Sequence, residues 1–281
     1  MPAMNSIDFT KMHGLGNDFV VIDCRAGGAA PDTDALRWIA DRRRGVGFDQ
    51  FLTIEPATAG ADAFMRIHNP DGSEAEACGN GTRCVAALLM SYSGRQQVAI
   101  ETLAGVLHCR RDADGQIAVD MGPVSIDWQS IPLATAVDSL HVMLPDAAYS
   151  DACCVAVGNP HAVFFVADAD AVALAEVGPA LETHPMFPAR ANIEFVSVIA
   201  PDRLRMRVWE RAAGITQACG SGACASAVAA ARRGLTGRQV SVVLDGGELG
   251  IAWGDDDHVI MRGPTATSFT GVLDLGAAGA S

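Results

Sequence analysis

The chain has 281 residues, 49% of them hydrophobic and 19% charged, which is an ordinary globular composition with room for about two domains. The formal net charge of −13 argues against bulk electrostatic binding to nucleic acid or to an anionic membrane. The apolar runs are far shorter than the ~20 residues of a membrane-spanning helix. The first residues lack the basic and hydrophobic regions of a secretory signal, so we expect a soluble cytoplasmic protein.

In the first half, the pattern predicts a peripheral amphipathic helix over residues 36–44 and a second helix after Cys78. The second helix is predicted because apolar residues recur at helical spacing from Val85 to Tyr92, and Gly94 then ends it. Short glycine-bounded strands are predicted at residues 98–103 and 116–121.

The second half predicts a similar series of elements. An apolar strand is expected at residues 162–166, followed by a peripheral helix over residues 168–182. A helix over residues 223–233 consists almost entirely of alanine and other small residues, and a helix that is apolar all round is a buried one. The remaining strands are predicted at residues 204–209, 240–244 and 258–261.

The two halves repeat one another at an offset near 141 residues. The matched segments, in chain order, are Gly16-Asn17 with Gly158-Asn159, Met65-Arg66-Ile67-His68 with Met206-Arg207-Val208-Trp209, Ala77-Cys78-Gly79-Asn80-Gly81 with Ala218-Cys219-Gly220-Ser221-Gly222, Gly94-Arg95-Gln96 with Gly237-Arg238-Gln239, and Val119-Asp120-Met121-Gly122-Pro123 with Ile260-Met261-Arg262-Gly263-Pro264. We therefore predict two pseudo-symmetric duplicated domains, residues 1–123 and 124–264, with the segment 265–281 joining the first. Each is expected to be an α+β domain with a mostly antiparallel, curved sheet wrapped around a central helix.

Each half carries a Cys-Gly-x-Gly turn, at residues 78–81 and 219–222, directly before its central helix. The free N–H groups of a helix N-terminus lower the pKa of a thiol there and bind carboxylate or phosphate. Burial in a closed cleft raises the pKa of the same thiol, and the sequence does not decide between the two effects.

Two such turns in facing domains predict a specific reaction. A thiolate on one side of a carbon acid removes a proton, and a thiol on the other side returns one. Inversion at an α-carbon needs two acid–base groups of one type, which the duplication supplies as Cys78 and Cys219. The helix starts are expected to stabilise charge on the substrate carboxylate in the transition state.

Several further polar residues have both a structural and a functional interpretation. The amide side chains near the turns are typical of turns and helix caps, but they are also candidate ligands for an amino acid. His161 precedes the apolar strand, where a histidine is often structural. Glu210 and Arg211 form either a surface ion pair or a site for a substrate ammonium and carboxylate. The amide residues are Asn17, Gln50, Asn69, Asn80, Asn159 and Asn192.

These residues lie in motifs that resemble the diaminopimelate epimerase family, whose members are cofactor-independent two-cysteine epimerases of lysine and peptidoglycan biosynthesis. The resemblance covers nearly the whole chain, and eight motifs in the family's order make it specific. The motifs are His13-Gly-Leu-Gly-Asn-Asp-Phe19, Gly47-Phe-Asp-Gln50, Asn69-Pro-Asp-Gly-Ser73, Ala77-Cys-Gly-Asn-Gly81, Gly158-Asn-Pro-His161, Asn192-Ile-Glu-Phe195, Glu210-Arg211 and Ala218-Cys-Gly-Ser-Gly222.

The resemblance implies that Cys78 and Cys219 are the acid–base pair, assisted by His161 and Glu210. It implies that the substrate carboxylate is held by backbone groups of Gly79-Asn80 and Gly220-Ser221. It also implies a homodimer, no metal, no cofactor and closure around a diaminopimelate substrate. The remaining implied substrate-binding residues are Asn17, Gln50, Asn69, Asn159, Asn192, Glu210 and Arg211.

The chain departs from the family pattern after Arg211. The family usually reads Gly-x-Gly-Glu-Thr there, whereas this chain has Ala212, Ala213, Gly214, Ile215 and Thr216. Alanine in place of glycine restricts the backbone if position 212 needs a positive φ. Replacing the glutamate with Ile215 removes a charge near the second cysteine, and Ser221 stands where threonine is common.

Other functions remain open at this point. A proline racemase or hydroxyproline epimerase would use the same two-cysteine chemistry. A thiol or metal protein would use Cys78, Cys84, Cys219 and Cys224, although their spacings do not match zinc knuckles. An anion-binding module would leave the cysteines to pack, as we expect for Cys24, Cys84, Cys109, Cys153, Cys154 and Cys224. A pyridoxal phosphate enzyme is disfavoured, because Lys11 is the only lysine available for its Schiff base.

Overall fold

A computed structural model describes residues 6–28, 30–58 and 60–275 of the chain. The chain divides into two compact units. Unit 1 contains the chain up to Val119 together with the chain from Pro264 onward, and unit 2 contains Asp120–Gly263.

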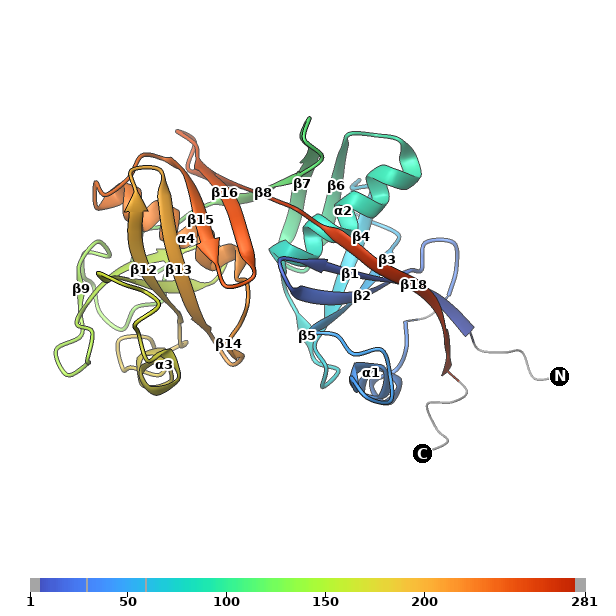
Figure 1. Ribbon diagram of the computed structural model, residues 1–281, viewed down its shortest axis with the longest axis horizontal. Coiled ribbons are helices and arrows are strands. Elements are labelled where there is room, and N and C mark those ends of the chain that lie inside the picture. The colour runs from blue at the N-terminus through green and yellow to red at the C-terminus, as the bar shows by residue number, and fades with distance from the viewer. Residues whose placement is uncertain (1–5, 29, 59, 276–281) are drawn as a thin grey trace. The chain divides into compact units, whose positions relative to one another are not determined.

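Unit 1 is a strongly curved sheet with a central helix. The last strand of the chain returns to pair with the first, and Figure 1 shows β18 (red) running alongside β1 (dark blue). Its strands are β1 (Ser6–Gly14), β2 (Asn17–Asp23), β3 (Gln50–Glu55), β4 (Ala63–His68), β5 (Glu74–Ala75), β6 (Gln97–Thr102), β7 (Gly105–Arg111), β8 (Ile117–Pro123, which continues into unit 2) and β18 (Ala266–Asp274), and its helices are α1 (Thr33–Ala40) and α2 (Gly79–Ser93).

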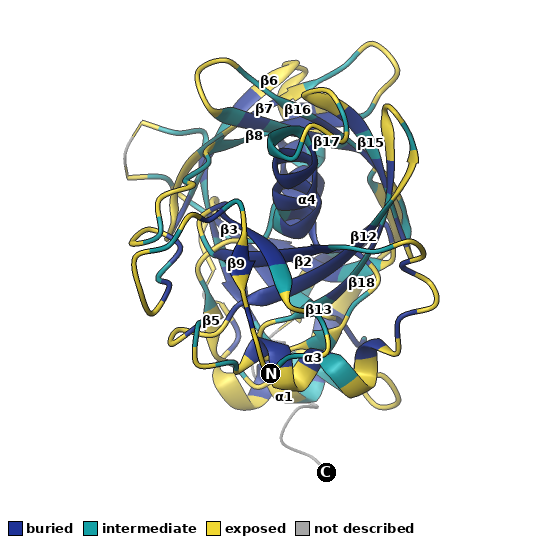
Figure 2. Ribbon diagram, turned by 90° about the vertical axis from the view of Figure 1, so that its left-hand side faces the viewer, coloured by how far each residue is buried: buried dark blue, intermediate teal, exposed yellow. Residues whose placement is uncertain are grey.

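Unit 2 has the same design. Figure 2 shows its central helix α4 coloured as buried, with strands of the unit around it. Its strands are β9 (Val142–Met143), β10 (Asp151–Ala156), β11 (Pro160–Phe165), β12 (Asn192–Ala200), β13 (Arg203–Glu210), β14 (Gly214–Ile215), β15 (Gln239–Leu244), β16 (Gly247–Trp253) and β17 (His258–Gly263), and its helices are α3 (Leu174–Glu182) and α4 (Gly220–Arg232).

The strand pairings repeat between the units and confirm the predicted duplication. In unit 1, β2 pairs in parallel with β3, and β4 pairs in parallel with β6. In unit 2, the parallel pairs are β11 with β12 and β13 with β15. The other pairs described within each unit are antiparallel, so the predicted fold, a duplicated α+β domain with a mostly antiparallel sheet around a helix, is confirmed.

Both central helices begin at a cysteine, as predicted. Cys78 and Cys219 are the N-cap residues of α2 and α4, with extended backbone angles. Gly94 ends α2 with φ +70°, a conformation that glycine adopts without the steric cost of a Cβ. No helix among the described residues is long and apolar enough to cross a membrane.

The two peripheral helices are shorter than predicted. The helix expected over residues 36–44 is α1, which begins three residues earlier, at Thr33, where the Asp32 carboxylate caps it. It ends at Ala40, because the Asp41 carboxylate accepts the N–H groups of Arg43 and Arg44 and forms a separate turn. The helix expected over residues 168–182 begins only at Leu174. The Asp168 carboxylate accepts the N–H of Asp170, and this local turn replaces the predicted first part of the helix.

Candidate active site

The first half-site is the start of α2 with the residues around it in unit 1. The Cys78 Sγ accepts the N–H of Gly81 at 3.3 Å, which satisfies one of the free donors of the helix N-terminus. Asn17, at the start of β2, places its Oδ1 4.0 Å from the Cys78 Sγ. The same oxygen accepts a hydrogen bond of 3.2 Å from the Asn80 amide. The structure thus brings Cys78, Asn17 and Asn80 together.

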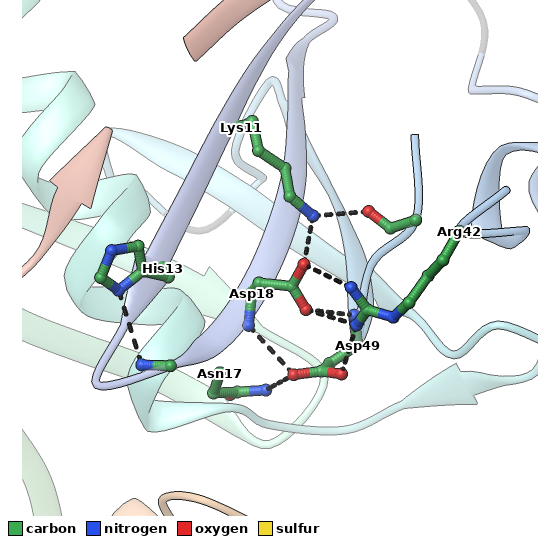
Figure 3. Close-up of polar contacts among 8 residues, drawn as sticks. Lys11, His13, Asn17, Asp18, Arg42 and Asp49 are labelled. Carbon is green, nitrogen blue, oxygen red and sulfur yellow. Dashed lines mark hydrogen bonds and ion pairs between the residues drawn. The ribbon is translucent and has the colours of Figure 1, made fainter. Parts of the chain in front are cut away.

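Asn17 is held in turn by an ionic network that sequence reasoning missed. Its Nδ2 donates to Asp49 Oδ2 at 3.0 Å, and Arg42 donates to the other oxygen of Asp49 at 2.9 Å. Figure 3 shows Arg42 and Lys11 both reaching Asp18, beside Asp49. Burial by itself raises the pKa of Asp18, but hydrogen bonds from Arg42 and Lys11 outweigh it and lower this pKa to about 2.

Gln50 and Asn69 form a second amide pair in unit 1. The Gln50 Nε2 donates to the Asn69 Oδ1 at 3.2 Å, and the Asn69 Nδ2 donates to the Ser73 Oγ at 3.1 Å. The Asn69 carbonyl accepts the N–H of Gly72, whose φ is +86°, so the predicted turn forms here. The turn fixes the Asn69 side chain next to the first residue of β3.

The second half-site is the start of α4 in unit 2. The Cys219 Sγ accepts the N–H of Gly222 at 3.3 Å, which is the same cap as that of Cys78, and lies 3.6 Å from the Ser221 Oγ. Burial raises the pKa of the Cys219 thiol well above its usual value, and the Glu210 and Glu194 carboxylates raise it further. The sequence did not decide whether burial or the helix N-terminus has the larger effect on the pKa of these thiols. At Cys219 the effect of burial is the larger.

Glu210 lies beside Cys219 at the end of β13. Its carboxyl accepts hydrogen bonds from the Thr216 hydroxyl and the Cys219 thiol. Burial raises the pKa of Glu210, although those two hydrogen bonds and the nearby His161 act in the opposite direction. A buried carboxyl group with a raised pKa therefore lies in direct contact with the Cys219 thiol.

His161 is completely buried at the start of β11. Its Nε2 lies 2.7 Å from Asn159 Oδ1, and its Nδ1 lies 2.6 Å from Glu194 Oε1. Glu194 is itself completely buried, on the neighbouring strand β12. It belongs to the motif at residues 192–195 but was not predicted as a site residue. A signal was available, since an ionisable residue stands between the apolar residues Ile193 and Phe195.

Asn192 and Arg211 form the outer part of the second half-site. The Asn192 amide donates to the Pro160 carbonyl at 3.0 Å and accepts the backbone N–H of Arg211 at 2.9 Å. The Arg211 side chain is exposed and donates to the Ala189 carbonyl at 3.3 Å. Arg211 is therefore held at its backbone while most of its guanidinium stays available.

The departure from the family pattern at residue 212 has a structural consequence. Ala212 has φ +63°, which an L-residue adopts only at a steric cost. Its N–H donates to Glu182 Oε1 at 3.1 Å, and the other oxygen of that buried carboxylate accepts the Trp209 indole N–H at 2.7 Å. Ile215, in place of the family's glutamate, is 43% exposed.

Most of the remaining cysteines pack as predicted. Cys84, Cys109, Cys153, Cys154 and Cys224 are buried, whereas Cys24 is only partly buried at the end of β2. Burial raises the pKa of Cys84 to about 12, so this thiol is inert at neutral pH.

The family model for diaminopimelate epimerase matches residues 9–126 and 153–267, one stretch in each half of the duplicated fold. The diaminopimelate epimerase of Rhodospirillum centenum is 60% identical over 266 residues, covering 94% of this chain and 91% of that protein. The diaminopimelate epimerase of Phenylobacterium zucineum is 52% identical over 277 residues, covering 97% of this chain and 100% of that protein.

Among solved structures, a hydroxyproline epimerase from Agrobacterium vitis matches with a TM-score of 0.67 and 16% identity, covering 100% of both chains. A probable proline racemase from Agrobacterium radiobacter matches with a TM-score of 0.67 and 18% identity, covering 94% of this chain and 92% of that one. At these identities the likeness establishes the fold, whereas the sequence relatives establish the family. The chain therefore belongs to the diaminopimelate epimerase family of isomerases.

Proposed function

We propose that the chain interconverts LL- and meso-2,6-diaminopimelate by transferring protons at the α-carbon through Cys78 and Cys219, in the synthesis of lysine and peptidoglycan precursors. The observation that carries the proposal is the repeated helix cap. In each unit a cysteine thiol accepts the N–H of the third helix residue at 3.3 Å, at equivalent positions of a duplicated fold. The identity of 60% to a diaminopimelate epimerase supports this substrate.

In the proposed reaction, one cysteine thiolate takes the α-proton, and the electron pair stays on the carbon in conjugation with the carboxylate. The thiol of the other cysteine donates its proton to the opposite face of that carbon. One proton is removed and one is returned, so the substrate changes only by inversion at the α-carbon, and the two cysteines exchange their protonation states. No electron leaves the substrate, so the reaction needs no oxidant or reductant.

The helix starts are the proposed site for the carboxylate of the reacting centre. The backbone groups of Gly79-Asn80 and Gly220-Ser221 lie in the first turns of α2 and α4, where free N–H groups and the helix dipole favour negative charge. These groups stabilise the charge that develops on the carboxylate as the proton leaves.

The remaining polar residues are proposed to recognise the two amino acid ends of the substrate. Arg211 suits a carboxylate and Glu210 an ammonium group, and the amides provide both donors and acceptors. The raised pKa of Cys219 supports its starting the cycle as the protonated thiol. His161 and Glu210 are proposed to assist the cysteines electrostatically. The proposed amide ligands are Asn17, Gln50, Asn69, Asn159 and Asn192.

We also propose that the protein is a cytoplasmic homodimer. All eight cysteines are free thiols, which supports a reducing compartment. The family resemblance supports the dimer, which light scattering of the purified protein would measure directly.

The test is incubation with LL-diaminopimelate in heavy water containing a thiol reductant, with deuterium at the α-carbon and the meso isomer both measured. We expect deuterium incorporation with inversion and no added cofactor. Cys78→Ala and Cys219→Ala are each expected to abolish meso formation while the circular dichroism spectrum is retained.

Cys84→Ala and Cys224→Ala are the matched controls, because each removes a buried cysteine five or six residues further along, inside the same helix. Both are expected to retain turnover. A folded but inactive Cys84→Ala variant contradicts the assignment of the turns. Exchange with proline or hydroxyproline instead of diaminopimelate would keep the two-cysteine chemistry and overturn the substrate.

A further inference from the structure

The duplicated fold contains one buried pair of residues that differs in chemistry between the two units. The strand registers define equivalent positions, since Phe19 pairs with Gln50 in unit 1 and His161 pairs with Asn192 in unit 2. Two residues further along β3 and β12, Leu52 is the equivalent of Glu194. All four side chains of the pairs Phe19/Leu52 and His161/Glu194 are completely buried, but only the second pair is ionisable.

The second member of each pair, Leu52 or Glu194, lies under the cysteine turn of its own unit. A Cβ added at Gly81 would lie 3.1 Å from the Leu52 Cδ1, and a Cβ added at Gly222 would lie 2.8 Å from the Glu194 Oε1. Gly81 and Gly222 are the residues whose N–H groups bond the two cysteine sulfurs. Glu194 therefore occupies, beneath Cys219, the place that an apolar side chain fills beneath Cys78.

The contacts of His161 determine where its protons lie. An ionised carboxylate only accepts hydrogen bonds, so Glu194 at 2.6 Å holds a proton on Nδ1. The Nε2 of His161 faces the amide oxygen of Asn159 at 2.7 Å, and this oxygen is also an acceptor. With both ring nitrogens facing oxygen acceptors, the surroundings of His161 are suited to an imidazolium. The second oxygen of Glu194 is buried and has no hydrogen-bond partner in the described part of the chain, so His161 is the group that compensates its charge.

The groups around this pair come from three elements. Glu210 lies on β13, Cys219 stands at the start of α4, and Cys154 lies on β10 within the electrostatic range of Glu194. The carboxylates of Glu194 and Glu210 therefore oppose ionisation of the Cys219 thiol. A positive charge on His161 would favour its ionisation. At the position equivalent to Glu210, the first half-site has the neutral residue Asn69, so it does not need such compensation.

We propose that Glu194 is a positioning residue of the second half-site, which fixes the Nδ1 proton of His161 and favours the imidazolium form as Cys219 loses and regains its proton. This inference rests on the proposed function, since it assigns Cys219 an acid–base role. Gly222 allows the close approach of Glu194, because a side chain at this position would collide with its carboxylate.

The first test is the histidine ¹⁵N NMR titration of the full-length protein, with His161→Phe used to assign the His161 signals. In Glu194→Gln the carboxylate is lost at nearly constant shape. We expect the His161 titration midpoint to fall by about 1 pH unit or more relative to the wild type, because an opposite charge is removed. Glu182→Gln is the matched control, since it neutralises another buried glutamate of unit 2, whose described partners include Trp209 and Ala212. The control is expected to leave the midpoint unchanged.

The second test measures epimerisation. Glu194→Gln is expected to lower kcat about 10-fold or more and to change KM less than about twofold, because Glu194 acts on proton transfer rather than on substrate binding. The basic limb of the kcat profile, where His161 loses its proton, should move to lower pH in the same direction as the NMR midpoint. An unchanged midpoint, or an increase in KM alone, overturns the inference.

A double variant keeps the test valid if Glu194→Gln folds poorly. His161→Phe/Glu194→Leu recreates the apolar pair that unit 1 already buries, so we expect it to fold with a cooperative thermal transition. If Glu194 acts through His161, Glu194→Leu causes no further loss of kcat in the His161→Phe background, because no imidazole remains for it to hold. If the two substitutions instead lower kcat by factors that multiply, Glu194 and His161 act independently, and the inference is wrong.

The two hypotheses fail in different ways. A wild-type protein that forms no meso isomer refutes the proposed function, yet its His161 titration still reports on the contact with Glu194. An active wild type whose His161 titration is identical in Glu194→Gln refutes only the inference about Glu194.

Discussion

The strained turn at Ala212 predicts that Ala212→Gly stabilises the protein. The left-handed conformation costs an L-residue about 1–2 kcal/mol, and Ala212 adopts it with φ +63°. Glycine does not have this cost, but it loses about 0.4–1 kcal/mol through the greater entropy of its unfolded chain. The expected net gain in the free energy of unfolding is therefore about 0.5–1 kcal/mol, equivalent to a rise in Tm of about 2 °C.

The neighbouring residue provides the control for this prediction. Ala213 is also exposed, but it lies outside the positive-φ region, so Ala213→Gly should destabilise the protein by about 0.4–1 kcal/mol through the unfolded state alone. Urea unfolding of both variants and the wild type, followed by circular dichroism, measures the difference. The bond from the N–H of residue 212 to Glu182 needs no side chain and is kept in Ala212→Gly. Equal changes of the same sign in both variants would refute the argument from backbone strain.

Two further predictions concern the ionic network of unit 1 and the buried cysteines. Because the folded-state pKa of Asp18 is lowered from 3.8 to about 2, its charge contributes about 2 kcal/mol of stability above pH 4, which is lost as the pH falls through 2. Asp18→Asn should therefore be less stable than the wild type at pH 7, and urea unfolding should show about half that difference at pH 3. Cys84→Ala should lower the free energy of unfolding by about 1–2 kcal/mol through lost packing, and Cys224→Ala should behave alike. An alkylating reagent that labels Cys84 in the folded protein at pH 7 would contradict its pKa of about 12.

The sequence was sufficient to predict the duplication and the two cysteine-capped helices, because these depend on local motifs. Repetition of the Cys-Gly-x-Gly turn located both N-caps, and Gly94 correctly ended the first central helix. The limits of the peripheral helices were wrong at Asp41 and Asp168, where a short side chain accepts backbone N–H groups and forms a turn. Such competition depends on side-chain geometry that periodicity does not contain.

The sequence did not predict the electrostatics of the second half-site, because they depend on contacts between residues far apart in the chain. The pKa of Cys219 depends on its burial and on two carboxylates that lie 9 and 25 residues earlier in the chain, at Glu210 and Glu194. The role of Glu194 also depends on strand register, since only the pairing of β11 with β12 places it against His161. The register further shows that the same position is occupied by Leu52 in the first unit.

The buried position of Lys11 affects how the protein responds to acylating reagents. Its ammonium group is bonded to Asp18 and to the Gly47 carbonyl, and the residue is only 7% exposed. As the chain has no other lysine, the described surface offers no side-chain amine to acetyl donors, aldehydes or N-hydroxysuccinimide esters. Its positive surface charge comes from arginine, which stays protonated and does not react with these reagents. Amine-directed cross-linking and immobilisation will therefore not attach to side chains of the described surface. Acylation will leave the charge of this surface unchanged, whereas it neutralises the lysine charges of lysine-rich proteins.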